Sequence, residues 1–235
     1  MRQEEIRRLS EGLERLLRNA GAALVGFGDL TGVTEGPLTT GVSVAVPLPV
    51  PIVEEIREGP TKAYYDTYHA LNARLDAIVT AGAAWLEERG WRAFAQTTGA
   101  VRQDGQWRTP LPHKTVATRA GLGWIGRSCL LVTPEYGSAL RLSSLVTDAP
   151  LPAAEAVTES RCGACRACVE ACPAGALKGA LWRPGMDRED LFDRQRCFEK
   201  QHELMRARTG IDADLCGKCF VVCPYTQRRL HREER

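Results

Sequence analysis

Hydrophobic residues recur at helical spacing in three segments of the first half of the chain. In residues 2–19 the apolar positions lie three and four apart with Arg and Glu between them, which predicts an amphipathic helix. The same period runs from Thr61, a candidate N-cap, to Gly90, a candidate stop. A shorter helix is predicted over residues 113–120.

Short apolar or alternating runs between these helices predict strands. They cover residues 22–27, 41–48, 91–96, 129–133 and 139–147. Helices and strands mixed in this irregular order favour an α+β fold or an α/β sandwich. Residues 148–158 are rich in Pro and Ala and are expected to link this part to a second one, so we divide the chain into domains 1–152 and 153–235.

Eight of the nine cysteines lie in the predicted second domain. The first run reads C-x2-C-x2-C-x3-C-P, a pattern of bacterial ferredoxins in which the fourth cysteine ligates the other of two 4Fe–4S clusters. A later run has only three cysteines, and Cys197, alone between the runs, supplies the missing fourth ligand. We therefore expect cluster I on Cys162, Cys165, Cys168 and Cys223, and cluster II on Cys172, Cys197, Cys216 and Cys219.

Two other uses of these cysteines are weighed against iron–sulfur clusters. C-x2-C pairs also bind zinc, but the x2-x2-x3-Pro spacing favours clusters. Disulfides are disfavoured because the chain is not a small secreted scaffold. A helix is predicted over residues 186–209, capped by Asp187 and ended by Gly210, so Cys197 should project from a helix and the other seven ligands from tight loops. Cys129, in an apolar run, is expected to be a buried thiol.

Charge and hydropathy limit the classes of partner and the compartment that we expect for this chain. The net charge of +2, from 31 Lys and Arg against 29 Asp and Glu, does not favour nucleic-acid binding by bulk electrostatics. No apolar run approaches the length of a membrane span. The N-terminus is charged and amphipathic rather than a signal peptide, and thiolate clusters suit a reducing compartment, so we expect a cytoplasmic protein.

Residues ahead of the cysteines offer further candidate sites. Gly121 to Gly126 match G-x-G-x-x-G, but a dinucleotide site needs a strand before and a helix after, and here the predicted order is reversed. These glycines form either a tight turn packed on the sheet or the wall of a cofactor pocket, and the residues alone leave both open. His113 adjoins Lys114 before this turn. Tyr64, Tyr65 and Tyr68 line a pocket or belong to the core.

The cysteine layout and the block H-K-T-V-A-T-R-A-G-L-G-W-I-G-R-S-C-L-L-V-T resemble the epoxyqueuosine reductases and the related reductive dehalogenases. The resemblance extends from about Tyr64 to Pro224. It implies a nitroreductase-like, cobalamin-binding α/β sandwich followed by a ferredoxin-like module with two 4Fe–4S clusters. Electrons would pass through the clusters to cobalamin, which reduces the substrate. The residues that would contact the corrin are Gly121, Gly123, Trp124 and Gly126.

The chain departs from that family at several points. Trp107 stands where the family has an aspartate proton donor, and the nearest acid is Asp104. We expect His113, Lys114 or a tyrosine such as Tyr68 to take that role. The chain ends twelve residues after Cys223, without the family's tRNA-reading repeats, so tRNA is not the expected substrate. It has no D-x-H-x-x-G motif, so no histidine is expected as lower cobalt ligand.

Three functions compete at this stage. The first is a cobalamin-dependent reductase of a small substrate, fed by an external donor such as a flavodoxin or ferredoxin. The second is a ferredoxin-like electron carrier that docks a partner protein and has no cobalamin chemistry of its own. The third, a zinc-bound structural or RNA-binding module, is disfavoured by the near-neutral charge.

Overall fold

The computed structural model describes residues 2–233, which divide into two compact units. Unit 1 comprises Met1–Val46, Leu71–Leu122 and Arg141–Val157. Unit 2 comprises Pro47–Ala70, Gly123–Leu140 and Thr158–Arg235. Each unit is thus assembled from three stretches of sequence, and the long helix α3 (Lys62–Glu87) begins in unit 2 and ends in unit 1.

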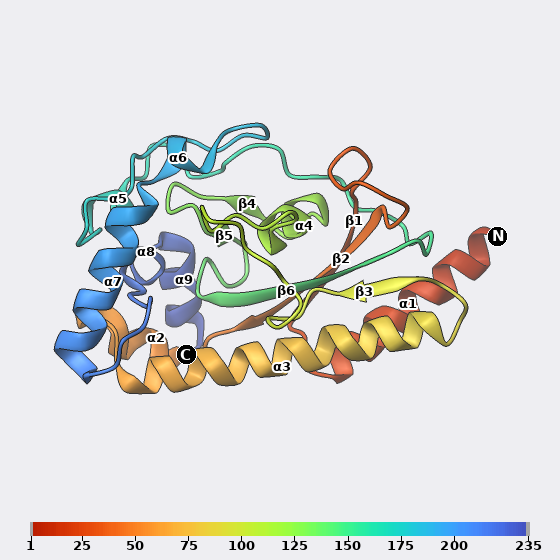
Figure 1. The fold of residues 1–235 in the computed structure, drawn as a ribbon, viewed down its shortest axis with the longest axis horizontal. Helices are drawn as coiled ribbons and strands as arrows, with labels where there is room; N and C mark the ends of the chain where they lie inside the picture. Colours follow the sequence, from red (N-terminus) through yellow and green to blue (C-terminus); the bar gives the residue numbers. More distant parts are fainter. Residues whose placement is uncertain (1, 234–235) are drawn as a thin grey trace. The chain divides into compact units, whose positions relative to one another are not determined.

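Unit 1 is built on a four-stranded sheet with the strand order β1-β2-β6-β3 (Figure 1). Its strands are β1 (Leu24–Asp29), β2 (Thr40–Pro47), β3 (Ala93–Ala95) and β6 (Leu140–Thr147). β1 pairs antiparallel with β2, and β3 pairs antiparallel with β6. The mixed α+β class predicted from the sequence is therefore confirmed.

Helices cover both faces of this sheet (Figure 1). On one face α1 (Gln3–Asn19) packs with α3, where Gly82 leaves room: a Cβ there would lie 2.8 Å from the Leu145 side chain and 2.9 Å from that of Leu17. On the other face α4 (His113–Arg119) contacts β1. A Cβ at Gly28 would lie 2.6 Å from the Arg119 backbone, so glycine in β1 permits this close approach.

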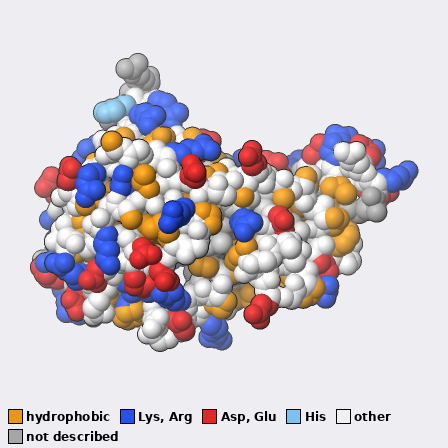
Figure 2. Space-filling view, turned by 90° about the horizontal axis from the view of Figure 1, so that it is seen from above, with side chains coloured by type: hydrophobic (Ala, Val, Ile, Leu, Met, Phe, Trp, Pro, Cys, Tyr) orange, Lys and Arg blue, Asp and Glu red, His pale blue; other side chains and the backbone are white. Residues whose placement is uncertain are grey.

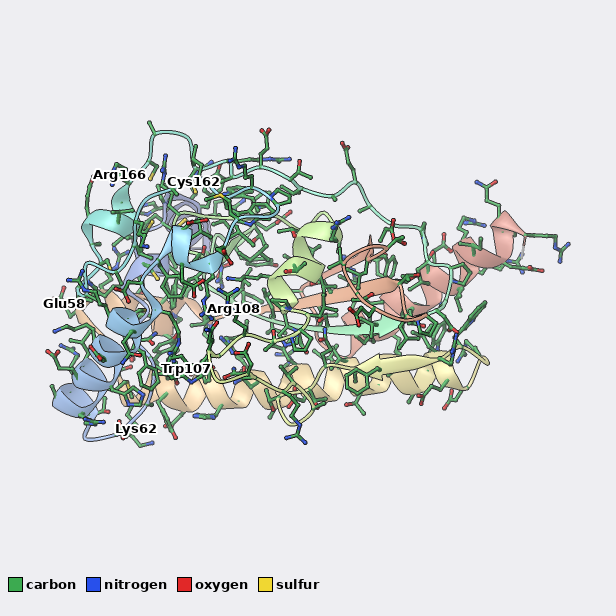
Figure 3. The ribbon with its side chains drawn as sticks, turned by 45° about the horizontal axis from the view of Figure 1, so that its top comes forward. Glu58, Lys62, Trp107, Arg108, Cys162 and Arg166 are labelled. Carbon is green, nitrogen blue, oxygen red and sulfur yellow. The ribbon has the colours of Figure 1, made fainter. Side chains whose placement is uncertain are left out.

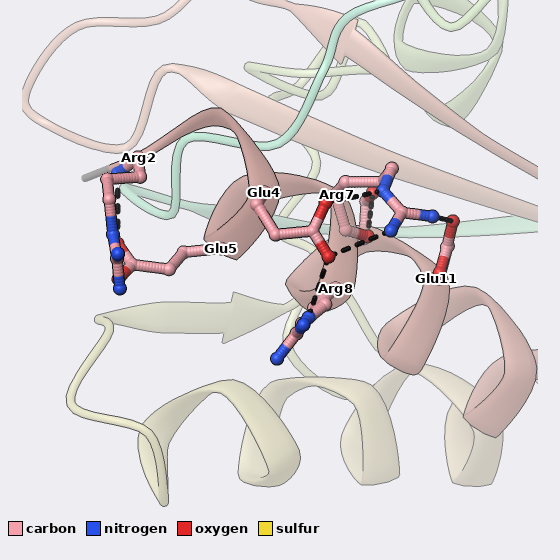
Figure 4. Close-up of polar contacts among 7 residues, drawn as sticks. Arg2, Glu4, Glu5, Arg7, Arg8 and Glu11 are labelled. Atoms are coloured by element: carbon pink, nitrogen blue, oxygen red, sulfur yellow. Dashed lines mark hydrogen bonds and ion pairs between the residues drawn. The ribbon is translucent and has the colours of Figure 1, made fainter.

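The outer face of α1 is stabilised by ion pairs between neighbouring turns (Figure 4). Glu4 accepts hydrogen bonds from Arg7 and Arg8, and Arg7 also pairs with Glu11 at 3.0 Å. Such exposed pairs contribute little to stability, because solvent screens their charges. The predicted amphipathic helix is confirmed: its apolar side is buried through Leu13 and Leu17.

Unit 2 consists of short helices and one small hairpin around the cysteines. The hairpin pairs β4 (Trp124–Ile125) with β5 (Leu131–Val132). The helices, besides the start of α3, are α2 (Val50–Glu55), the 3-10 turn η1 (Ile56–Glu58), α5 (Ala167–Glu170), α6 (Arg188–Leu191), α7 (Arg194–Thr209), α8 (Lys218–Val221) and α9 (Pro224–Glu233). Thr61 Oγ1 accepts the Tyr64 N–H at 3.1 Å, so the predicted cap of α3 is confirmed.

Three local predictions in unit 2 are wrong in detail. The helix expected over residues 186–209 is two helices, because Phe192 takes an extended conformation and bridges to Leu177. Asp193, not Asp187, caps the second of them by accepting the Arg196 N–H at 3.0 Å. The strand expected from residue 129 begins only at Leu131, since Cys129 lies in a turn with φ +59°.

The end of the described chain and the expected linker both make contacts within their own units. The tail from Gln227 forms most of α9 and buries Arg229 and Leu230, while its last two residues lie outside those described. In the expected linker, Ala154 N–H donates to the Phe27 carbonyl at 2.8 Å and Val157 N–H donates to the Thr118 carbonyl at 2.9 Å. These backbone bonds place residues 154–157 within unit 1.

Acidic and basic side chains are interspersed on the face that Figure 2 shows, in keeping with the small net charge. Across residues 2–233, every helix is too short or too polar to cross a membrane.

Candidate iron–sulfur centre

All eight candidate ligands, which are the seven cysteines of the two runs together with Cys197, lie in unit 2. Cys197 projects from the first turn of α7, as predicted. Cys168 and Cys219 lie within the single-turn helices α5 and α8, which corrects the expectation of loops for every other ligand. Figure 3 marks Cys162 and Arg166 on the loop that leads into α5.

The cysteines expected to hold cluster I are gathered in one group. Burial raises the pKa of the Cys168 thiol to about 11, and the charges of Cys162, Cys223 and Cys165 add to this shift. The charges of Cys162 and Cys165 in turn raise the pKa of Cys223. The last cysteine of the chain therefore lies beside the first three, as the reciprocal ferredoxin arrangement requires.

The other four cysteines form the second group. Burial raises the pKa of Cys197 to about 11. The charges of Cys172 and Cys216 make the next largest contributions in the same direction. The pKa of Cys219 lies well above its ordinary value, first through burial and then through Cys216 and Cys197. The charge of Cys168, from the first group, also raises the pKa of Cys219, so the two groups are neighbours.

A cavity of about 220 Å³ lies at the first group. Its walls include all four cysteines expected for cluster I, together with Cys219 of the other group. Arg127, Arg161 and Arg228 also line it. Sequence reasoning did not single out these arginines, although Arg127 directly follows the glycine block and Arg161 directly precedes Cys162.

Backbone donors point at several of the sulfur atoms. Ala176 N–H donates to Cys172 Sγ at 3.4 Å. Backbone N–H groups of Tyr225 and Thr226 bond to Cys223 and act to lower its pKa, against the larger effect of burial. Such N–H donors stabilise thiolate over thiol and are one of the means by which proteins tune iron–sulfur clusters.

These groups fit 4Fe–4S clusters chemically. Buried thiols with raised pKa values stay protonated at neutral pH unless a metal centre displaces the proton. In residues 2–233, no three His, Cys, Asp or Glu side chains are arranged to hold a single metal ion. A 4Fe–4S cube has irons and sulfides between its thiolates and so holds them farther apart than one ion does. One complete group of four cysteines lines a single cavity, as a cube held by four thiolates requires.

The glycine block is closely packed against its own chain. A Cβ at Gly123 would lie 2.1 Å from the Val132 carbonyl oxygen, and one at Gly126 would lie 2.8 Å from the Val132 side chain. Trp124 between them is 1% exposed, and its ring meets that of Tyr225 edge-on at 4.9 Å. Gly121 has φ +71° after α4, a conformation that favours glycine. Packing within the chain is therefore one reason for glycine at these positions, and their predicted contact with a corrin stays a prediction.

The remaining candidates are divided between the two units. In unit 1, His113 Nδ1 lies 2.8 Å from Ser144 Oγ, and burial followed by the Arg141 charge lowers the pKa of His113 to about 4. Lys114, beside it on α4, is half-buried. In unit 2, Tyr68 is half-buried and its ring lies edge-on to His69 at 5.4 Å.

Two further residues that the sequence raised lie in different surroundings, one buried and one exposed. Tyr64 is buried and packs edge-on against Phe220 with ring centroids 6.0 Å apart, so it belongs to the core of unit 2. Trp107, labelled in Figure 3, is 42% exposed in a loop, and its backbone N–H donates to the Asp104 carbonyl.

Comparison with known proteins agrees with the cysteine arrangement. Residues 161–226 match a family described as a 4Fe-4S double cluster binding domain. The epoxyqueuosine reductase of Synechococcus sp. (strain CC9605) is 31% identical over 186 residues, which cover 68% of this chain and 55% of the relative. That of Bacillus anthracis is 42% identical over 122 residues, covering 48% and 29%. The chain spans about half the length, or less, of these curated relatives.

Solved structures share the fold. An epoxyqueuosine reductase crystallised with an epoxyqueuosine-modified tRNA stem loop matches with a TM-score of 0.61 at 23% identity, covering 97% of this chain and 68% of that one. A reductive dehalogenase, described with a mechanism for B12-dependent dehalogenation, matches with a TM-score of 0.69 at 18% identity, covering 95% and 33%. The resemblance noted in the sequence is confirmed.

Proposed function

We propose that this chain, a relative of the epoxyqueuosine reductases with a 4Fe–4S double-cluster binding domain, is an oxidoreductase that passes single electrons through two clusters to a second redox cofactor. One observation carries the proposal: the four cysteines expected for cluster I, Cys223 among them, line one cavity together with Cys219 of the other group. Neighbouring clusters suit a relay, because an electron can pass directly from one to the other. Cys219, which belongs to the second group but lines the cavity of the first, connects them.

Cobalamin is the cofactor we propose at the end of this relay. The support is the fold shared with a reductive dehalogenase described as B12-dependent. In this proposal residues 1–152 form the nitroreductase-like cobalamin domain and residues 153–235 the ferredoxin-like domain. Bound cobalamin would supply a strongly reducing cobalt centre. The glycine block lends no support to a corrin wall, since β5 fills the space beside Gly123 and Gly126.

Two of the three candidate proton donors for a substrate are favoured over the third. The half-buried imidazole of His113 has a pKa lowered by burial to about 4, so it is mostly neutral at pH 7 and is the weakest of the candidate proton donors there. The Lys114 ammonium and the Tyr68 hydroxyl remain as proposed donors. The electron source would be a small carrier such as a flavodoxin or ferredoxin, and the substrate a small molecule, in the reducing cytoplasm.

A second function stays in view because of the same glycine block. If packing alone explains Gly121, Gly123 and Gly126, the chain has no demonstrated corrin contact and could work as a two-cluster electron carrier that docks a partner. The N-terminal unit would then serve docking rather than catalysis.

Titration with cobalamin separates these functions. The chain is purified anaerobically with its clusters, reduced with dithionite, and mixed with cob(II)alamin while the visible and electron paramagnetic resonance spectra are recorded. A saturable change in the cobalt signal supports the reductase. Unchanged cobalt spectra in a protein with intact clusters would refute it and favour the carrier.

A further inference from the structure

Arg127 holds two segments of unit 2 together beside the cavity of cluster I. One terminal nitrogen of its guanidinium donates to the Gly163 carbonyl at 2.7 Å, and the other donates to the Gly179 carbonyl. Gly163 lies between Cys162 and Cys165, at φ +54°. Arg127 therefore fixes the loop that carries the first two ligands of that cluster.

The third donor of the same guanidinium has no partner. Arg127 Nε is buried and makes no hydrogen bond within residues 2–233. A buried donor left unsatisfied costs about 1–3 kcal/mol, and more when it is charged. Arg127 also lines the cavity, together with the four cysteines expected for cluster I. An acceptor inside the cavity would satisfy Nε, and a 4Fe–4S cube would bring sulfur acceptors there.

We propose that Arg127 Nε–H donates a charge-assisted hydrogen bond to a sulfur of cluster I and raises the reduction potential of that cluster. The inference rests on the proposed function, since it requires the two clusters. Reduction adds one electron from the external reductant to the cube and breaks no bond. The added charge is stabilised by a donor pointed at the sulfurs, and such hydrogen bonds are among the determinants of cluster potential.

The other two arginines of the cavity differ from Arg127. Arg161 and Arg228 are exposed, and the Arg228 guanidinium lies 4.0 Å from the centre of the Tyr225 ring. Solvent screens their charges. Arg228 is therefore a matched control, because its removal takes one positive charge from the cavity wall without removing a buried donor.

The test compares Arg127→Lys with Arg228→Gln in the full chain with clusters. Midpoint potentials come from redox titrations followed by electron paramagnetic resonance, and iron and sulfide are counted in each sample. Arg127→Lys keeps the charge but loses Nε. We expect the midpoint potential of one cluster to fall by about 59 mV, which corresponds to a tenfold change in its one-electron reduction equilibrium. Arg228→Gln should shift it by much less. An unchanged potential in Arg127→Lys with both clusters present would overturn the inference.

A second measurement avoids the variant altogether, in case Arg127→Lys fails to retain cluster I. Wild-type protein is grown with arginine labelled with ¹⁵N at Nε only, reduced, and examined by pulsed electron paramagnetic resonance. We expect a ¹⁵N hyperfine coupling to a reduced cluster. Its absence would overturn the role of Arg127, whereas a wild-type protein without two clusters would refute the proposed function instead.

Discussion

Replacing Gly123 with alanine tests whether the glycine block serves packing or a cofactor. The new Cβ would lie 2.1 Å from the Val132 carbonyl oxygen, 1.3 Å short of the 3.4 Å at which ordinary contact begins. The obstacle is backbone, so no side-chain rotation relieves it. The adjacent β4–β5 hairpin has only two residue pairs, Trp124 with Val132 and Ile125 with Leu131, and cannot absorb such a shift without losing its register.

The expected cost is about 3 kcal/mol, the upper end for overpacking, because the clash moves backbone. For a chain of this size that corresponds to a fall of roughly 6–12 °C in Tm. Anaerobic melting is followed by the visible absorbance of the clusters, which reports on unit 2. Gly99→Ala is the control, since nothing lies within 4 Å of a Cβ there. A Gly123→Ala protein that melts with the control would refute the packing account.

Three further predictions follow from single residues. Cys197→Ala should retain about four of eight irons, because only cluster II loses a ligand. Cys129→Ala, which changes a thiol packed among apolar side chains, should retain all eight. Equal iron content in the two variants would contradict the assignment. Burial lowers the pKa of His113 from 6.5 to about 4, so the unfolded chain binds a proton that the folded chain does not, and stability falls as pH drops from 6.5 to 4. His113→Gln should therefore lose less stability than wild type between pH 8 and pH 5 in urea unfolding, and equal losses would contradict the shift. Gly210→Ala, at φ +74° at the end of α7, should cost about 1–2 kcal/mol in the same unfolding assay, and no loss would contradict the left-handed cap.

The sequence predicted those features that depend on local pattern. Residues 2–19, the helix from Thr61 and the main strands emerged because apolar spacing and caps act over a few residues. Where the helix predicted over residues 186–209 was wrong, a distant part of the chain decides the structure: Phe192 is extended and bridges to Leu177.

The gathering of the candidate ligands was predictable from the sequence, and their surroundings were not. Cysteine spacing carries its own chemistry, and the grouping of Cys223 with the first run agrees with the structure. The arginines around the cavity carry no motif, so only the fold could reveal Arg127 at Gly163. The roles of His113, Lys114, Tyr68 and the glycine block, and the division at residue 152, stay predictions.

Iron and acid-labile sulfide in the anaerobically purified chain, with the iron state read by Mössbauer spectroscopy, test the central claim most directly. The two groups of cysteines predict about eight irons and eight sulfides per chain, all in 4Fe–4S clusters. Zinc bound in place of iron, with no sulfide, would contradict the account.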